Sequence, residues 1–529
     1  MRLCVAGRPQ GMCRGLRPLS SLTSRQGTAS RSDRDTAPVD PTERGVRKPA
    51  VAADASPALV WLRDDLRLDD NPAFAASADR PTVALYVLED GPGAPRPLGG
   101  AARWWLHHAL SALAARLAAR GAALVLRRGD PRRIVPEVAL GNGFGSVFWN
   151  RRYRPADQAS DAAVKAELKQ AGVEARSFKG ALLFEPWEIQ TGSGGPYKVF
   201  TPFWRAAQSR AIDPPYPTPP AWPQGAPEVA GEALDDWTLL PTSPDWAGGM
   251  RAAWTPGEAG ARARLEQFLD GPLKGYAQAR NLPAVTGTSR LSPHLRFGEI
   301  GPRRVYHAAA AAAARRGLQA DGEVFHAELG WREFSYGLVN HFPDFPETSW
   351  KPEFERMPWR DDPTHLKAWQ RGQTGYPIVD AGMRELWTTG WMHNRVRMIV
   401  GSFLVKHLMI HWRRGEEWFW DTLVDADAAN NAAGWQWIAG SGADAAPYFR
   451  IFNPVTQGEK FDPEGAYVRR WAPELGRLPN AFVHKPWQAP SEVLRACGLR
   501  LGLDYPYPIV DHAQARQRAL DAYAGLKAA

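Results

Sequence analysis

The sequence predicts two folded domains, a doubly wound α/β domain followed by an all-α domain, and three observations support this. The chain has 529 residues, which is too long for one ordinary core. Its first third contains short apolar runs separated by amphipathic stretches. From residue 256 onward the apolar residues recur at helical spacing nearly throughout, with no convincing strand.

The apolar runs predict buried parallel strands, because such strands are apolar on both faces. They cover residues 59–61, 83–87, 123–126 and 147–149. Between the second and third runs, leucines recur at helical spacing, and Gly121 follows as a C-cap. Alternating strands and helices are typical of a doubly wound domain, which we place at residues 57–186.

The rest of the chain divides into a connection, a helical domain and an N-terminal extension. Residues 214–254 are dense in Pro, Gly and Trp and lack a period, so we expect a linker over 187–255 and the helical domain over 256–529. Residues 1–56 resemble a transit peptide in composition. A disordered tail or a start codon placed too early explains them more economically.

Net charge and cysteine content limit the possible classes of function only broadly. The net charge is +9, but residues 1–56 hold ten basic and five acidic side chains, so only +4 belongs to the rest. Cys4, Cys13 and Cys497 form no disulfide framework, which favours a reducing, cytoplasmic setting.

No apolar run approaches the roughly 18 residues of a membrane span. His407 and His411 have a metal-binding spacing, but without a third ligand we expect no metal.

The helical region is unusually rich in polar aromatic motifs. Of 23 tryptophans, 11 fall within residues 331–437; they fit either a heavily aromatic core or electron relays and base-stacking plates. Residues 425–437 combine two carboxylates, an amide and two indoles, and residues 444–454 and 457–460 follow. Such a combination suits a large polar aromatic ligand beside a polyanion.

These motifs, together with residues 61–68 (WLRDDLRL) and 288–292 (TSRLS), resemble the DNA photolyase and cryptochrome family. The resemblance covers roughly residues 58–486. It implies that the α-helical domain binds FAD. The implied FAD-binding residues are Tyr276, Thr288, Ser289, Arg290, Leu291, Ser292, Arg332, Arg397, Asp425, Ala426, Asp427 and Asn431.

Residues 288–293 also allow an interpretation without the family. Three hydroxyls and a guanidinium precede a helix that would begin at Pro293, which suits a diphosphate. An ordinary cap by Ser292 explains the same residues. The resemblance favours the FAD phosphates.

The resemblance implies a lesion site whose residues are Glu328, Asn394, Met398, Asn431, Trp331 and Trp437. Glu328, Trp331 and Arg332 share one helix face, on which the family's Glu bonds the damaged base, its Trp stacks on it and its Arg approaches the flavin. Enzymes that repair (6-4) photoproducts carry two histidines where this chain has Asn394 and Met398, which cannot do acid work. His393 is expected to be structural. Asn431 matches the residue that faces flavin N5 in photolyases.

The resemblance further implies light-driven repair of cyclobutane pyrimidine dimers in DNA, by a class I or class III type enzyme acting as a monomer. Electron transfer would run through Trp435, Trp412 and Trp359, with Trp387 and Trp391 as possible branches; core packing is an equal reading of Trp387. The DNA would be contacted by Arg280, Trp331, Arg395, Gln457 and Lys460. Alternatives are a cryptochrome-like photoreceptor or, less favoured, a (6-4) photolyase. The α/β domain is expected to hold an antenna chromophore, a folate or a deazaflavin, with another flavin or no antenna as the alternatives. Ala156 and Asp157 replace the Asn-Glu pair that binds folate in the best-known folate-binding members of the family.

Overall fold

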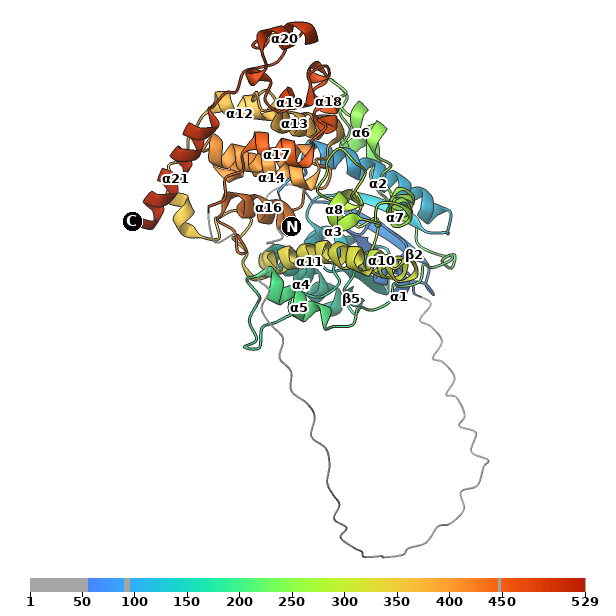
Figure 1. The fold of residues 1–529 in the computed structure, drawn as a ribbon. Helices are drawn as coiled ribbons and strands as arrows, with labels where there is room; N and C mark the ends of the chain where they lie inside the picture. The colour runs from blue at the N-terminus through green and yellow to red at the C-terminus, as the bar shows by residue number, and fades with distance from the viewer. Residues whose placement is uncertain (1–55, 90–95, 446–448, 529) are drawn as a thin grey trace, which may run out of the picture. The chain divides into compact units, whose positions relative to one another are not determined.

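A computed structural model describes residues 56–89, 96–445 and 449–528. The N-terminal extension, apart from Ser56, therefore lies outside the described residues. The prediction of an α/β domain followed by a helical domain is confirmed (Figure 1).

The α/β domain is built on a five-stranded parallel sheet with strand order β3-β2-β1-β4-β5. The strands are β1 (Ala58–Leu62), β2 (Thr82–Leu88), β3 (Ala123–Arg128), β4 (Ser146–Asn150) and β5 (Glu174–Phe178). In register, Val60 lies opposite Ala84 of β2 and Phe148 of β4. The sequence reading missed β5, because this edge strand (EARSF) is only partly buried and has no apolar run.

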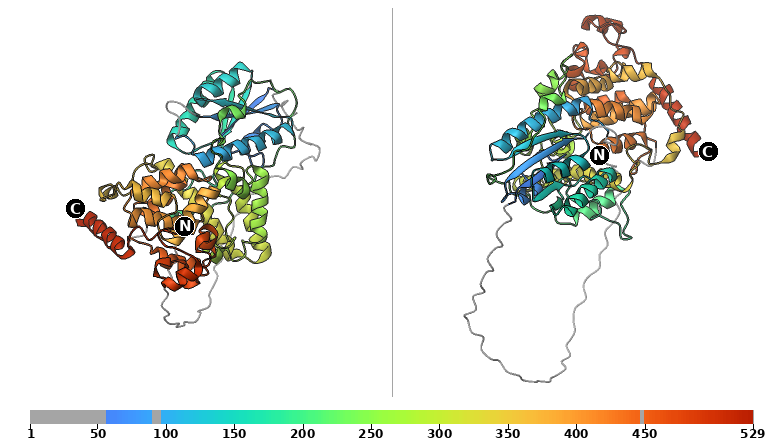
Figure 2. Two further views of the ribbon diagram at one scale, coloured as in Figure 1. Left: turned by 90° about the horizontal axis from the view of Figure 1, so that it is seen from above. Right: turned by 180° about the vertical axis from the view of Figure 1, so that it is seen from behind.

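The two faces of the sheet are covered by different helices (Figure 2). Ala58, Val60 and Leu62 of β1 pack in one cluster with α1 (Pro72–Ala76) and α2 (Gly100–Ala118). Leu59 and Trp61 point to the other face, where they pack with α3 (Pro131–Gly141) and α4 (Pro155–Gln170). This alternation follows from the two-residue period of a strand. It explains why the central strands are apolar at every position.

The connection between the domains contains more secondary structure than its composition suggested. It holds α5 (Phe200–Gln208), the 3₁₀ helix η1 (Leu234–Trp237) and α6 (Gly248–Ala253). Phe200, Phe203 and Trp204 of α5 are buried in a cluster that also contains residues of the helical domain. This segment is therefore partly a structural element of that domain.

The long helix α11 (Gln319–His341) of the helical domain packs against α5, α8 (Tyr276–Ala279), α10 (Pro302–Arg316) and α16 (Ala428–Ala439). No extended strand occurs among the described residues of this domain, apart from an isolated bridge between Leu501 and Tyr505. Its helices are α7 (Glu258–Asp270), α8 (Tyr276–Ala279), α9 (Ser292–Arg296), α10 (Pro302–Arg316), α11, η2 (Pro352–Arg356), α12 (Pro363–Gln370), α13 (Pro377–Thr389), α14 (Asn394–Ser402), η3 (Phe403–His407), α15 (Trp412–Thr422), α16 (Ala428–Ala439), α17 (Pro454–Phe461), α18 (Ala466–Trp471), η4 (Pro473–Leu475), α19 (Asn480–Val483), η5 (Pro486–Gln488), α20 (Ser491–Cys497) and α21 (His512–Ala528).

Among the described helices, none is long and apolar enough to cross a membrane. The described residues also contain no group of three or more His, Cys, Asp or Glu side chains placed to hold a metal ion.

Candidate flavin and DNA site

The start of α16 places three predicted flavin ligands. Asp427 is the N-cap of α16, and its carboxylate accepts hydrogen bonds from the backbone N–H groups of Ala429 and Asn430 at 2.9 and 2.7 Å, as capping requires. Asp425 accepts two bonds from the Arg397 guanidinium, at 3.1 and 2.8 Å. Asp425, Asp427 and Asn431 are each only 8% exposed. A bidentate pair between a buried carboxylate and a half-buried guanidinium fixes both partners in orientation.

Asn431 is tied to α15 through its amide nitrogen. Nδ2 donates to the backbone oxygen of Glu416 at 3.1 Å and to its carboxylate Oε1 at 2.7 Å. Both amide hydrogens are then used. The carbonyl oxygen of Asn431 is left as an acceptor.

The 288–292 segment is held against two tryptophans. Arg290 has φ +51°, and its guanidinium lies 4.5 Å from the ring of Trp254 and 4.7 Å from that of Trp391. The Trp391 indole N–H donates to Ser292 Oγ at 3.2 Å. Helix α9 begins at Ser292 with Leu291 as its N-cap, one residue earlier than expected. Burial lowers the pKa of the Arg290 guanidinium within this hydroxyl-bearing segment.

The chemistry of these residues suits the binding of FAD. Arg290 Nε and His393 Nε2 are buried with no hydrogen-bond partner in the described part of the chain, although buried polar groups are normally satisfied. Hydroxyls and a guanidinium suit a diphosphate, and the Arg397–Asp425 pair and the Asn431 carbonyl suit the polar edge of a flavin ring. Tyr276, another predicted ligand, is buried and packs its ring against Phe268.

Helix α11 separates its three predicted residues into two environments. Glu328, which is predicted to bind the lesion, accepts a hydrogen bond at 2.6 Å from Arg280, which is predicted to bind DNA. Trp331 is half-buried, and its Nε1 has no partner in the described part of the chain. Arg332 donates to the Ala181 carbonyl at 2.8 Å and lines a cavity at the domain boundary.

His393 is the N-cap of α14, where its Nδ1 accepts the backbone N–H of Arg395 at 3.2 Å. Burial, and then the charges of Arg395 and Arg397, lower the pKa of His393 to about 3. This imidazole is therefore neutral near pH 7. Asn394 is half-buried at the start of the same helix, and Met398 is buried.

The predicted tryptophan relay is partly traceable as ring contacts. Trp412 is fully buried, and its indole N–H donates to Ser349 Oγ at 3.0 Å. His411 lies between it and Trp359, with ring centroids 5.7 and 5.1 Å away respectively. Trp435 packs so closely on α15 that a Cβ at Gly415 would come 2.1 Å from its ring.

Two further tryptophan contacts are relevant to the predicted electron-transfer chain. Trp369, which the sequence reading did not single out, lies 6.1 Å from Trp435; nothing in its local sequence distinguishes it from a core residue. Trp387 is 59% exposed and stacks on Trp418 at 5.9 Å with parallel rings. Trp387 is therefore a surface residue.

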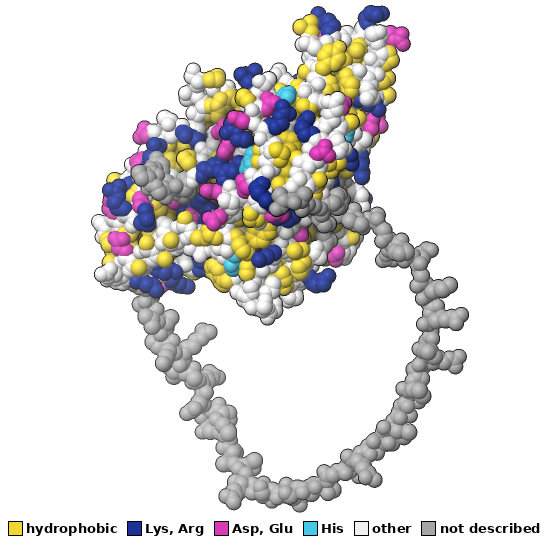
Figure 3. All heavy atoms as spheres, turned by 90° about the vertical axis from the view of Figure 1, so that its left-hand side faces the viewer, with side chains coloured by type: hydrophobic (Ala, Val, Ile, Leu, Met, Phe, Trp, Pro, Cys, Tyr) yellow, Lys and Arg dark blue, Asp and Glu magenta, His cyan; other side chains and the backbone are white. Residues whose placement is uncertain are grey.

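Two of the predicted DNA-contacting residues lie around Phe461, the last residue of α17. The Arg395 guanidinium lies 4.3 Å and the Lys460 ammonium 5.3 Å from the Phe461 ring, and Arg395 also donates to Asn281 Oδ1 at 2.6 Å. Gln457 lies on the same helix, half-buried. On the face shown in Figure 3, basic side chains are interspersed with acidic and apolar ones.

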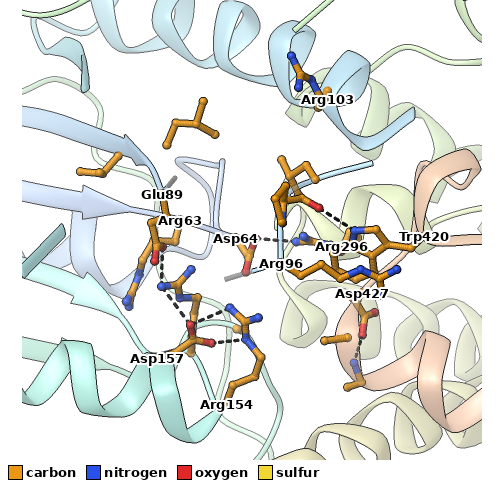
Figure 4. A pocket seen from close by; sticks show the side chains of 18 of the residues that line it. Arg63, Asp64, Glu89, Arg96, Arg103, Arg154, Asp157, Arg296, Trp420 and Asp427 are labelled. Atoms are coloured by element: carbon orange, nitrogen blue, oxygen red, sulfur yellow. Dashed lines mark hydrogen bonds and ion pairs between the residues drawn. The ribbon is translucent and has the colours of Figure 1, made fainter. Parts of the chain in front are cut away.

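A second site lies where the α/β and helical domains meet. A cavity of about 400 Å³ opens at the carboxyl ends of the sheet strands, the usual ligand position in doubly wound folds. Figure 4 shows arginines from both domains around it, among them Arg96, Arg103, Arg154 and Arg296. Its aromatic lining residues are Tyr86, Tyr153, Trp237, Tyr336 and Trp420.

Ion pairs order the polar wall of this cavity. Asp157 accepts bonds from Arg154 at 2.7 and 2.8 Å and pairs with Arg152 at 3.2 Å. Asp64 pairs with Arg296 at 2.6 Å. Burial alone would raise the pKa of Asp64, but the charges of Arg296 and Arg152 lower it to about 2. Arginines outnumber carboxylates among the lining residues, so the wall favours an anionic ligand.

The fold and these two sites define a class of two-domain flavin-binding proteins with a second ligand cavity at the boundary of the two domains. Family models match as DNA photolyase over residues 58–223 and as the FAD binding domain of DNA photolyase over residues 325–525. A deoxyribodipyrimidine photo-lyase of Agrobacterium fabrum is 53% identical over 476 residues, covering 89% of this chain and 98% of the relative. The chain therefore belongs to the DNA photolyase family.

Two further comparisons place the chain within that family. Cryptochrome-1 of Arabidopsis thaliana is 40% identical over 476 residues, covering 88% of this chain and 70% of the relative. The crystal structure of a bacterial class III photolyase from Agrobacterium tumefaciens superposes with a TM-score of 0.86 and 51% identity, covering 91% of this chain and all of that one. The chain is thus similar in both sequence and fold to a class III photolyase.

Proposed function

We propose that this protein is a deoxyribodipyrimidine photo-lyase that repairs cyclobutane pyrimidine dimers in DNA under blue light. One observation of the site carries the proposal. The half-buried indole of Trp331 lies on α11, whose Glu328 is paired with Arg280 at 2.6 Å, within a domain that matches the FAD binding domain of DNA photolyase. A stacking plate beside a hydrogen-bonding carboxylate suits an extruded base.

When bound and reduced, FAD would supply the light-driven electron for opening the cyclobutane ring and would take it back at the end of the cycle. The chain's own residues hold it. Arg397 and Asp425 orient each other by two hydrogen bonds, and the hydroxyls of residues 288–292 bind the diphosphate. Asn431, whose Nδ2 is used by Glu416, offers only its carbonyl oxygen, so it accepts a hydrogen bond without delivering a proton.

DNA binding rests on Arg280, Arg395, Gln457 and Lys460, which contact backbone phosphates. Such contacts give affinity without reading sequence and weaken with salt. Trp331 and Trp437 form the two walls of the lesion pocket. An already distorted, poorly stacked dimer costs less to extrude than an intact pair. This explains how few base contacts suffice.

A competing function is that of a cryptochrome-like photoreceptor. It predicts bound flavin and a light response but no change in the DNA. A third reading, (6-4) repair, needs a proton donor at the lesion. His393 is held neutral by burial, with a pKa of about 3, and neither Asn394 nor Met398 can donate a proton as an acid. We therefore favour dimer repair, which requires only an electron.

The boundary cavity is proposed to hold the antenna chromophore, a folate or a deazaflavin. Its aromatic and arginine-rich lining and its volume of about 400 Å³ suit an aromatic anion. Asp157 is already engaged by Arg152 and Arg154, so we expect a grip that differs from the family's Asn-Glu pair. Absorption of the purified protein near the folate and deazaflavin bands identifies the chromophore, and a spectrum of flavin alone contradicts this assignment.

The deciding experiment follows dimer loss in single-stranded and duplex DNA under blue light with a reductant, for the natural protein and Trp331→Ala. We expect loss of dimers that requires light and falls sharply in the variant. Bound, reduced flavin without any dimer loss would overturn the proposal in favour of the photoreceptor. Loss confined to (6-4) lesions would support the third function.

We also propose that the protein works as a monomer in the cytoplasm. Light scattering of the purified protein measures the first, and fractionation of the source cells measures the second.

A further inference from the structure

Helix α5 belongs to the connection between the domains, yet its first residue touches the lesion site. Phe200 is only 1% exposed. Its ring lies face to face with Trp331, with centroids 3.8 Å apart and planes 7° from parallel. One face of the Trp331 indole is therefore covered by α5. The opposite face is the one left to stack on a base.

More aromatic side chains back this stack. Trp204, one turn further along α5, lies parallel to Phe200 at 6.3 Å. Helix α11 can approach Trp204 because residue 330 is glycine: a Cβ there would come 2.3 Å from the Trp204 ring. Phe334 meets the edges of both Trp331 and Phe200, at 5.9 and 6.0 Å. The plane of Trp331 is thus fixed on several sides.

Helix α5 also lies near the segment that follows Trp437, the residue proposed as the second wall of the lesion pocket. Burial raises the pKa of Asp444, and the backbone N–H of Phe200, one of the donors that the first turn of a helix leaves unpaired, partly offsets this rise. Asp444 comes shortly after Trp437 and the end of α16. Helix α5 therefore links the segment carrying Trp331 to the segment that follows Trp437.

We propose that Phe200 is a positioning residue for lesion recognition, and that α5 braces the two walls of the lesion pocket. This inference rests on the proposed function and extends it by giving the inter-domain segment a role in the site. Holding an indole in its binding orientation reduces the ordering cost of binding. The brace should therefore act on affinity for the damaged base and leave binding to the phosphates unchanged.

The test is Phe200→Leu, which keeps apolar volume but removes the stacked ring. The control is Phe342→Leu: Phe342 packs in the same apolar cluster but against Trp350, 4.6 Å away. Dissociation constants are measured in the dark for an oligonucleotide with one dimer and for its undamaged counterpart, with flavin absorbance as the check on folding. In Phe200→Leu we expect about fivefold weaker binding of the damaged strand, the size of one aromatic pair, and unchanged binding of the undamaged one.

Every other outcome of these binding measurements either supports or overturns the proposed role of Phe200. Lesion affinity equal to the natural protein in flavin-loaded Phe200→Leu overturns the brace, as does an equal loss for Phe342→Leu or for undamaged DNA. If Phe200→Leu loses its flavin, Asp444→Ala decides instead: about threefold weaker lesion binding supports the brace, and unchanged binding overturns it. A natural protein that binds no lesion overturns the proposed function itself, together with this inference.

Discussion

The flavin site and the boundary cavity both hold carboxylates in place with nearby donors, but the cavity includes one ion pair whose partners lie much farther apart along the chain. Asn431 and Glu416 are 15 residues apart, and Arg397 and Asp425 are 28 apart. In the cavity, Asp64 and Arg296 are separated by 232 residues. Partners close in sequence can be recognised as motifs. Partners far apart become a site only when two domains pack together.

The largest expected effect separates the two sites by removing one arginine from each. Arg397→Met leaves Asp425 buried without its bidentate partner, which costs several kcal/mol and should weaken FAD binding about 100-fold. Arg154→Met is the matched control, because Asp157 keeps its contact with Arg152. Flavin titration of the apoprotein measures both. Equal flavin loss in the two variants would show that the sites are not independent.

A second variant tests whether Asn431 must be neutral. In Asn431→Asp, two carboxylates would face each other across the 2.7 Å contact now made to Glu416, costing about 2 kcal/mol of stability near pH 7. We expect slower photoreduction, followed by flavin absorbance, and a lower unfolding midpoint. Adding Glu416→Gln should recover part of both, since the Gln amide can donate to the new carboxylate. No recovery would contradict this electrostatic account.

A third prediction concerns acid stability. The folded pKa of His393, about 3, lies below the unfolded value of about 6.5. The unfolded chain therefore binds more protons between these pH values, and stability is complete above pH 6.5 and falls as the pH drops. For this residue the loss is about 2 kcal/mol at pH 5. His393→Asn keeps an N-cap acceptor but does not titrate, so its denaturation midpoint should fall less between pH 7 and 5.

The smallest effect is expected at the rim of the cavity. Arg103 donates to the Thr238 carbonyl at 2.8 Å and is drawn at the edge of the cavity in Figure 4. Arg103→Ala should weaken binding of an anionic chromophore by only about threefold, because an exposed charge is screened by solvent. Chromophore absorbance gives the occupancy. The rate of repair under direct excitation of the flavin should be unchanged. A fall in that rate would show that the cavity residue also affects the flavin or DNA site.

Sequence reasoning succeeded where the signal is local. Buried strands such as β1 and β4 carry apolar side chains on both faces, so they were visible as runs, whereas the partly buried edge strand β5 was not. The grouping of Arg397 with Asp425 could likewise be anticipated from motifs. Helix α5 was predicted to be part of a connection, because it lies next to residues 214–254, which are dense in Pro, Gly and Trp and lack a period.

By itself, the sequence determined the order of the two domains, the resemblance to the photolyase family and the residue types of the flavin site. The order of the domains follows from periodicity, and the expected flavin residues follow from the resemblance, which is carried by short motifs. Only the tertiary structure decided that Phe200 covers one face of Trp331, that Trp369 approaches Trp435, and that arginines of both domains surround one cavity. The physical reason is that these contacts join segments distant in sequence, and close packing of the folded chain brings them together.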